Sequence, residues 1–334
     1  MKSVRKPTIR MRLFDFAGLV LLVGALSALA QQPAAADSAE PCSIALSSAA
    51  PLGHWDLHLG PERTATASLS LPADRSILLE AQEIGDDIDV EVAAGSMAAA
   101  RAGSPVPRRG VIRVLLRTDH SGQPTVLIHA MVGGGPGRRI TLRAYDEQAP
   151  QAASCQAVAG ALAAGDAAFA QAQRVSSGQG TANSSRADFY AGARQQYMRA
   201  FDSLAPQNLA SRAQVAHMLA TLSCKNLEDW RECERWSAQA TGLFQRAGDA
   251  QGRADAEAFQ ALARMELAQL PDAATAADPV RHDSRAMVRQ SLDQLRGLTA
   301  FYVRRGELFD AAEQLNLTGL IRYNAGDYRA ALVA

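Results

Sequence analysis

The residues whose types could perform chemistry are few and widely spaced in this chain of 334 residues. Nucleophilic catalysis by cysteine needs a thiolate beside a histidine that accepts its proton. His217 and Cys224 could form such a pair, but the cysteine lies in helical sequence rather than in a small-residue loop after a strand. We therefore interpret His217 as a packed or solvated side chain, and we predict no catalytic residue within this chain.

His54 and His58 have the spacing of a metal-ligand pair on a helix. The proline and glycine residues around them argue against a helix, so this segment, with Trp55, is predicted to form a loop or an edge strand. Zinc would need four converging ligands, and the six histidines are scattered along the chain. The sequence therefore predicts no metal site and no cofactor.

Two further segments match ligand loops only in part. Asp86, Asp87 and Asp89 could present carboxylates to Ca²⁺, but no closing glutamate follows, so a solvated turn that starts a strand is favoured. Residues 133–137 are rich in glycine, but neither Lys-Ser/Thr nor a helix follows them. They predict a hairpin tip rather than a phosphate loop.

The N-terminus has the pattern of a secretory signal peptide. Basic residues precede an apolar run over 16–30, which ends in small residues. We expect cleavage of 1–30 between Ala30 and Gln31, followed by a disordered linker over 31–41. An uncleaved membrane anchor is the alternative.

The charge balance gives no sign of a nucleic-acid partner. Residues 1–30 carry five Lys or Arg and one Asp, so the remaining chain has 29 basic and 33 acidic residues, a net charge of −4. This unclustered balance lacks the basic patch that binds nucleic acids or anionic membranes. We expect neither partner after removal of the signal peptide.

Four cysteines in an exported chain permit disulfides. Of the three possible pairings we favour Cys42 with Cys155, at the edges of the predicted β domain, and Cys224 with Cys233, nine residues apart across a helix-turn-helix. Buried unpaired thiols are the alternative, because free Cys often serves as a small core residue.

Alternating apolar residues predict a β-sandwich over 42–147, with turn-forming residues between the strands. The alternating residues are Ile112, Val114 and Leu116, then Val126, Ile128 and Ala130, then Ile140, Leu142 and Ala144. Residues 66–71, 76–81, 86–90 and 139–145 resemble the bacterial pre-peptidase C-terminal domain. That resemblance implies a noncatalytic module attached to an exported enzyme.

Residues 148–334 have the apolar spacing of α-helices. Two groups of apolar residues each share one predicted helix face: Tyr190, Tyr197, Phe201 and Leu204, and then Val288, Leu292, Leu295 and Tyr302. Polar stretches over 176–188 and 271–283 predict loops. We expect six to eight helices in antiparallel pairs.

The C-terminal residues carry a repeat pattern. An apolar helix over 315–325, which contains Gly319, is followed by the turn Gly326-Asp327-Tyr328 and by the start of a second helix. This string resembles the first two thirds of a tetratricopeptide repeat (TPR), a helix pair of about 34 residues that needs stacked neighbours.

The helix pairs around Phe201 and Trp230 are expected to be divergent repeats that lack the Gly-Asp turn. A signal peptide, a sandwich and divergent TPR helices in this order resemble the exported bacterial CHAT proteins, whose C-terminal domain is a caspase-like peptidase. The resemblance covers the accessory parts and implies a periplasmic or secreted scaffold. Since the repeat pattern stops at Ala334, we expect an N-terminal portion of a longer protein.

Basic and aromatic residues of the helices are the candidate partner-binding residues. Arg194, Arg231 and Arg235 could capture an acidic peptide, and Trp230 and Trp236 could line a concave surface. Solvated faces and the seam between stacked helices explain the same residues, and this alternative stays open.

Together these patterns predict an α+β multidomain protein, an N-terminal β-sandwich followed by a TPR-like α-helical solenoid. The predicted function is an exported scaffold that binds a peptide or protein partner and makes no bonds. The alternative is a self-contained envelope-binding protein whose sandwich binds polysaccharide or Ca²⁺, which exposed aromatic side chains around Trp55 would support.

Overall fold

The computed structural model of the chain describes residues 51–82, 87–93, 100–106, 110–118, 123–132, 139–146, 156–176, 185–269, 284–324 and 326–333. The predicted signal peptide and linker, Cys42, Cys155, Asp86 and residues 133–137 lie outside these ranges. Strands occupy the described residues up to Asp146, and helices follow from Gln156 onward.

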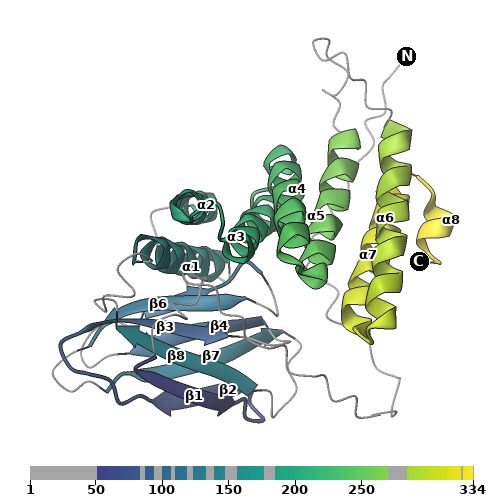
Figure 1. The fold of residues 1–334 in the computed structure, drawn as a ribbon. Helices are drawn as coiled ribbons and strands as arrows, with labels where there is room; N and C mark the ends of the chain where they lie inside the picture. The colour runs from purple at the N-terminus through teal and green to yellow at the C-terminus, as the bar shows by residue number, and fades with distance from the viewer. Residues whose placement is uncertain are drawn as a thin grey trace. The chain divides into compact units, whose positions relative to one another are not determined.

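Two four-stranded antiparallel sheets are formed by the described strands (Figure 1). The first has the order β1 (Gly53–His58), β8 (Arg139–Asp146), β3 (Ser76–Gln82) and β6 (Val111–Arg117), and the second has the order β2 (Thr64–Ser68), β7 (Thr125–Val132), β4 (Asp87–Ala93) and β5 (Ala100–Gly103). β1 lies at an edge, where it pairs with β8. The segment with His54 and Trp55 is therefore an edge strand, one of its two predicted forms.

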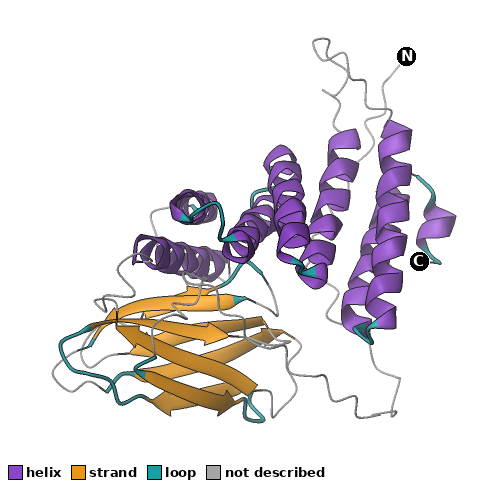
Figure 2. Cartoon of the chain, in the orientation of Figure 1, coloured by secondary structure: helices purple, strands orange, loops and turns teal. Residues whose placement is uncertain are grey.

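The apolar residues that alternate in the sequence meet in one core between the sheets, which are orange in Figure 2. Ile112 of β6, Val126 of β7 and Leu142 of β8 are fully buried in this cluster. Alternate residues of a strand point to opposite faces, so two sheets that stack their apolar faces produce such a core. The predicted faces of these strands are confirmed, while the side chain of Ala130 is not among those described.

The helices follow the strands and are purple in Figure 2. They are α1 (Gln156–Ser176), α2 (Arg186–Ser203), α3 (Leu209–Thr221), the π-helical turn η1 (Leu222–Asn226), α4 (Trp230–Ala247), α5 (Ala250–Gln269), α6 (Ser284–Arg304), α7 (Leu308–Asn324) and α8 (Tyr328–Ala331). Each helix from α3 to α7 packs against the next helix in the chain. None of the described helices is long and apolar enough to cross a membrane.

The polar stretch predicted as a loop over 176–188 gives way to α2 earlier than expected. The Ser185 hydroxyl accepts the Asp188 backbone N–H at 3.2 Å, and the Asp188 carboxylate accepts the Ser185 backbone N–H at 2.9 Å. This reciprocal pair is a capping box, which satisfies N–H groups that a helix start leaves unpaired. The last residues of the polar stretch therefore begin the helix.

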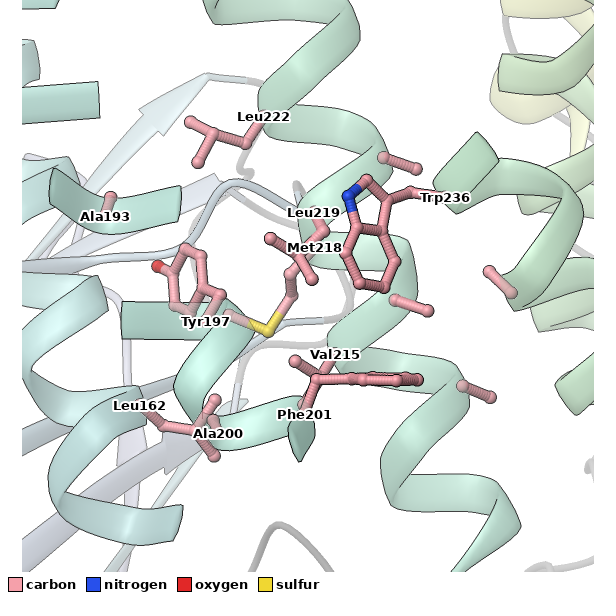
Figure 3. Close-up of a cluster of buried hydrophobic side chains, with 14 of the residues drawn as sticks. Leu162, Ala193, Tyr197, Ala200, Phe201, Val215, Met218, Leu219, Leu222 and Trp236 are labelled. Carbon is pink, nitrogen blue, oxygen red and sulfur yellow. The ribbon is translucent and has the colours of Figure 1, made fainter. Parts of the chain in front are cut away.

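Two of the apolar clusters among the described helices contain the predicted shared faces. In the first, Tyr190, Tyr197, Phe201 and Leu204 of the predicted shared face are all buried, and Figure 3 shows Tyr197 and Phe201 in this cluster together with Trp236. In the second, Leu295 and Tyr302 are fully buried, with Val288 and Leu292 packed against them. Both predicted faces are confirmed.

Three of the described helices end in a left-handed glycine that precedes an acidic residue. Gly248 (φ +77°), Gly306 (φ +74°) and Gly326 (φ +83°) follow α4, α6 and α7, where glycine avoids the steric cost of positive φ. Asp249 then caps α5 by accepting a backbone N–H at 2.8 Å. The expectation that the helix pair around Trp230 lacks a Gly-Asp turn is therefore wrong.

Candidate functional site

The residues considered as metal ligands do not converge in the structure. His54 and His58 lie on the exposed side of β1, and His54 Nε2 is 3.6 Å from Asp56 Oδ1. Asp86 and the side chain of Asp87 are outside the described set, and burial raises the pKa of Asp89 above its ordinary value. Across the described residues, no three His, Cys, Asp or Glu side chains gather as metal ligands would.

Cys224 and Cys233 form a disulfide, which is the pairing that their spacing favours. Cys224 belongs to η1 and Cys233 to α4, their Cα atoms are 5.1 Å apart, and both are buried. A sulfur in this bond carries no thiol, so it cannot act as the nucleophile of a pair with His217. The imidazole instead contacts the rings of Phe244 and Phe259, at centroid distances of 6.0 and 5.6 Å.

The two tryptophans considered as partner contacts serve the interior of the helices. Trp236 is 4% exposed, and its Nε1–H donates to Glu232 Oε2 at 3.1 Å. Its ring meets that of Phe201 edge-on, with centroids 5.2 Å apart. Trp230 is half-buried and packs against the cluster that contains the disulfide. These rings pack between helices, so little of their surface is accessible to a partner.

The three arginines considered with them differ in their surroundings. Arg194 Nη1 lies 3.1 Å from Asp229 Oδ2, and Arg235 pairs with Glu232 on its own helix. Arg231 is exposed on α4. The Arg194–Asp229 pair is half-buried, and the Arg235 guanidinium also lies over the Trp236 ring, 4.5 Å from its centroid. Both guanidinium groups would therefore lose contacts within the chain if they bound a partner.

A groove runs between the start of α5 and the end of α6, with a volume of about 300 Å³. We call it the α5–α6 groove. Its lining residues are Ala250, Arg253, Ala254, Glu257, Asp293, Gln294, Gly297, Leu298, Phe301 and Arg304. Ala254 and Leu298 are buried, whereas Arg253, Asp293 and Arg304 are exposed. The groove therefore combines an apolar interior with charged residues of both signs around it.

Three charged residues of the α5–α6 groove, Arg253, Glu257 and Asp293, are already paired. Arg253 Nε lies 3.5 Å from Glu257 Oε1, and Asp293 Oδ1 lies 2.8 Å from the guanidinium of Arg296. Arg304 forms no ion pair with any residue that the structure describes. Its charge is therefore available to an acidic group on a bound molecule.

Gly297 lines this groove without a side chain. It lies inside α6 and is exposed, and a Cβ built on it would meet no atom within 4 Å. Glycine inside a helix costs about 1 kcal/mol relative to alanine, and packing within the chain gives no reason for it here. Its effect is to leave the helix backbone accessible from the groove.

A buried ion cluster joins the strands to the first two helices. Arg113 of β6 and Glu80 of β3 lie with Asp166 of α1 and Tyr197 of α2, and all four side chains are at most 3% exposed. The Arg113 guanidinium lies 3.4 Å from the Glu80 carboxylate and 3.6 Å from that of Asp166. Asp166 also accepts the Arg113 backbone N–H and the Tyr197 hydroxyl, each at 2.8 Å.

Burial raises the pKa of both carboxyl groups in this cluster, Glu80 and Asp166, to about 7. The Arg113 guanidinium faces both carboxylates, and Arg143 also favours the charged form of Glu80, but these charges compensate the cost of burial only in part. Burial and the neighbouring Asp166 together raise the pKa of the Tyr197 hydroxyl well above its ordinary value, which keeps it a hydrogen-bond donor. The cluster joins β3 and β6 to α1 and α2.

No family model and no curated protein matches this chain. The function is therefore inferred from the geometry of the α5–α6 groove.

Sequence reasoning did not find the cluster, because Arg113 and Glu80 alternate with core residues and so belong to the predicted solvent face of their strands. The residue in the sequence that could have indicated a buried partner is Asp166. A lone acid in the alanine-rich run of α1 breaks an otherwise apolar helix and needs a buried partner.

Proposed function

We propose that this chain is an exported, noncatalytic interaction protein whose TPR-like helices bind a peptide or protein partner in the α5–α6 groove. Recognition would use shape and charge, without bond making. The observation that carries the proposal is the groove itself, with buried Ala254 and Leu298 inside it and exposed Arg253, Asp293 and Arg304 around it. Such a site suits a peptide that buries one apolar side chain between charged neighbours.

The packing of the helices supports a TPR-like reading. Successive helices from α3 to α7 pack side by side (Figure 1), and short turns with Gly248 and Gly306 join α4 to α5 and α6 to α7. Short turns of this kind make consecutive helices antiparallel, and arrays of antiparallel helix pairs commonly bind peptides on their surface. The resemblance of residues 315–332 to a TPR points the same way.

A selection from a random-peptide phage library tests this proposal. The purified chain is used as bait, in parallel with Gly297→Gln, which places a side chain in the groove without a clash inside the protein. Gly242→Gln is the matched control, because Gly242 is an exposed glycine inside α4 whose Cβ would also meet nothing within 4 Å. We expect a peptide consensus for the wild type and for Gly242→Gln, and its loss for Gly297→Gln. Equal enrichment by all three would refute the groove as the binding site.

The envelope-binding alternative finds less support around Trp55. This side chain is half-buried and packs against the core of the strands together with Leu57. Its ring also covers Gly53, where an added Cβ would lie 2.1 Å from the indole. A tryptophan in this position fills space at the sheet edge and offers a polysaccharide little stacking surface.

A further inference from the structure

A second hollow lies where the residues around β6 meet α3 and the turn between α4 and α5. It has a volume of about 180 Å³, and we call it the His217 cavity. Among its lining residues are Arg113, Gln214, His217, Phe244, Asp249 and Asp255. Pockets for drug-sized ligands usually measure about 300–1,000 Å³, so this cavity has room for a single side chain or a molecule of that size.

The inner part of the cavity is mostly apolar and contains an uncharged histidine. Met218 and Phe244 are about 95% buried, and His217 is 7% exposed. Burial, with a contribution from Lys225, lowers the pKa of His217 to about 4, so the imidazole is neutral near pH 7. Its Nδ1 is buried and has no hydrogen-bond partner among the described residues. An unpaired buried nitrogen costs free energy that a bound polar group could recover.

Acceptor groups lie among the less buried residues of the cavity. Asp249 is exposed and Asp255 is half-buried. Gln251 donates its Nε2–H to Glu307 at 2.7 Å, which fixes the amide orientation, and its Oε1 is then buried without a partner within the described residues. These groups accept hydrogen bonds and favour positive charge.

The charged residues that line the cavity also favour a bound cation. Arg113 is the one cationic residue in the described lining, and its guanidinium already faces the carboxylates of Glu80 and Asp166. Asp249 and Asp255 add two further carboxylates, while His217 contributes no charge. The described lining therefore has one cationic residue, Arg113, against two carboxylates, Asp249 and Asp255, and is net negative.

We propose that the His217 cavity binds a primary ammonium or guanidinium group carried on a short apolar stem. The stem packs against Met218 and Phe244, and the charged end is held by Asp249, Asp255 and the acceptor groups beside them. The chemistry fits a Lys or Arg side chain of a protein partner and equally a small free amine. This site is separate from the α5–α6 groove, so it stands whether or not the groove binds a peptide.

Isothermal titration calorimetry at low salt tests the proposal with three probes. They are an acetylated and amidated glycine peptide with a single lysine, the same peptide with norleucine in place of lysine, and n-butylamine. We expect the lysine peptide to bind and the norleucine peptide, which lacks only the charge, not to bind. Binding of n-butylamine as well would indicate a free-amine ligand, whereas binding of the lysine peptide alone would indicate a protein side chain. Equal heats from the lysine and norleucine peptides, or no heat from any probe, would overturn the proposal.

Charge-removing variants locate the site. Asp249→Asn keeps the cap of α5, because Asn caps helices as well as Asp does, and it should weaken lysine-peptide binding about threefold. Adding Asp255→Asn, which keeps an acceptor for the Tyr302 hydroxyl, should raise the loss to about tenfold. Asp202→Asn on the exposed side of α2 is the control and should leave affinity unchanged. Equal weakening by the Asp202 variant would mean that the amine binds nonspecifically and would contradict the assignment.

Discussion

The carboxylate of Asp166 on α1 accepts the backbone N–H of Arg113 on β6 at 2.8 Å, and it also lies 3.6 Å from the guanidinium of the same residue. A single side chain of the first helix thus binds both the main chain and the charge of a strand. Both residues are at most 1% exposed, so neither water nor salt weakens this contact. It adds a buried polar contact to the packing of α1 against β5 and β6.

Removing Asp166 should therefore destabilise the protein strongly. Asp166→Ala leaves the Arg113 charge and a backbone N–H buried with fewer partners, which costs about 3–5 kcal/mol. Urea unfolding followed by circular dichroism measures the loss. Asp202→Ala on the surface of α2 should change the free energy of unfolding by less than about 0.5 kcal/mol, and a similar effect of both variants would contradict the role of the cluster.

The Tyr197 hydroxyl should contribute a smaller amount, because it donates one hydrogen bond to Asp166. Tyr197→Phe removes that bond and keeps the ring, so we expect a loss of about 1.5–3 kcal/mol in the same unfolding assay. Tyr323→Phe is the matched control, since Tyr323 is 44% exposed. A loss no larger than that of the control would mean that the hydroxyl does not stabilise Asp166.

The cluster should make stability depend on pH in an unusual direction. Burial raises the pKa of Glu80 from 4.5, and that of Asp166 from 3.8, to about 7 in the folded state. Between about pH 4 and pH 7 the folded protein then binds more protons than the unfolded chain, so this contribution is present at low pH and lost as the pH rises. His217 opposes it, because its lowered pKa gives stability that is present above pH 6.5 and lost toward about pH 4.

The variant Glu80→Gln separates these contributions. It removes one titrating carboxyl group and leaves His217 unchanged, so the free energy of unfolding of the wild type should fall relative to that of the variant as the pH rises from 4.5 to 7. Urea midpoints across this range provide the measurement. Parallel pH profiles of the two proteins would show that Glu80 titrates normally.

Gly165 tests the packing of α1 on α2. A Cβ at this position would lie 2.4 Å from the ring of Tyr197, which is fully buried and held by Asp166, so Gly165→Ala should cost about 1–3 kcal/mol. Gly160→Ala on the same helix meets nothing within 4 Å and should stabilise by about 0.5–1 kcal/mol. Thermal unfolding gives both values, and the account fails if the two changes have the same sign.

The Cys224–Cys233 disulfide closes a short loop between η1 and α4. Replacing both residues with serine should lower the free energy of unfolding by about 2–4 kcal/mol, because the unfolded chain gains freedom. Chemical denaturation of the double variant without added reductant measures this effect and leaves the other cysteines unchanged. A double variant as stable as the wild type would mean that the bond does not constrain the chain.

The elements with one buried face were readable from the sequence. Ile112 in β6 and Phe201 in α2 lie on predicted faces and are buried, because a period of two or of 3.6 residues follows directly from backbone geometry. The β-region followed by helices could be predicted for the same reason. The Gly248-Asp249 turn between α4 and α5 could also have been predicted, because the same residue pair occurs at Gly326-Asp327.

Contacts between distant segments were not readable. Arg113 looks like a solvent-facing residue until α1 brings Asp166 over it, and no local pattern encodes that meeting. From the sequence, Trp236 is a candidate partner contact, but in the structure its ring is buried against Phe201. The groove needs the packing of α5 on α6, and the cavity needs residues around β6 to meet α3 and the start of α5, so neither follows from a local pattern.

Binding of a peptide in the α5–α6 groove can be measured by fluorescence anisotropy with a labelled peptide of the selected consensus. Arg304→Glu reverses an exposed charge in the groove, and Arg246→Glu makes the same change on α4, outside the lining. We expect at least tenfold weaker binding for Arg304→Glu and an unchanged Kd for Arg246→Glu. Equal affinities of the two variants would show that the peptide does not bind in the groove.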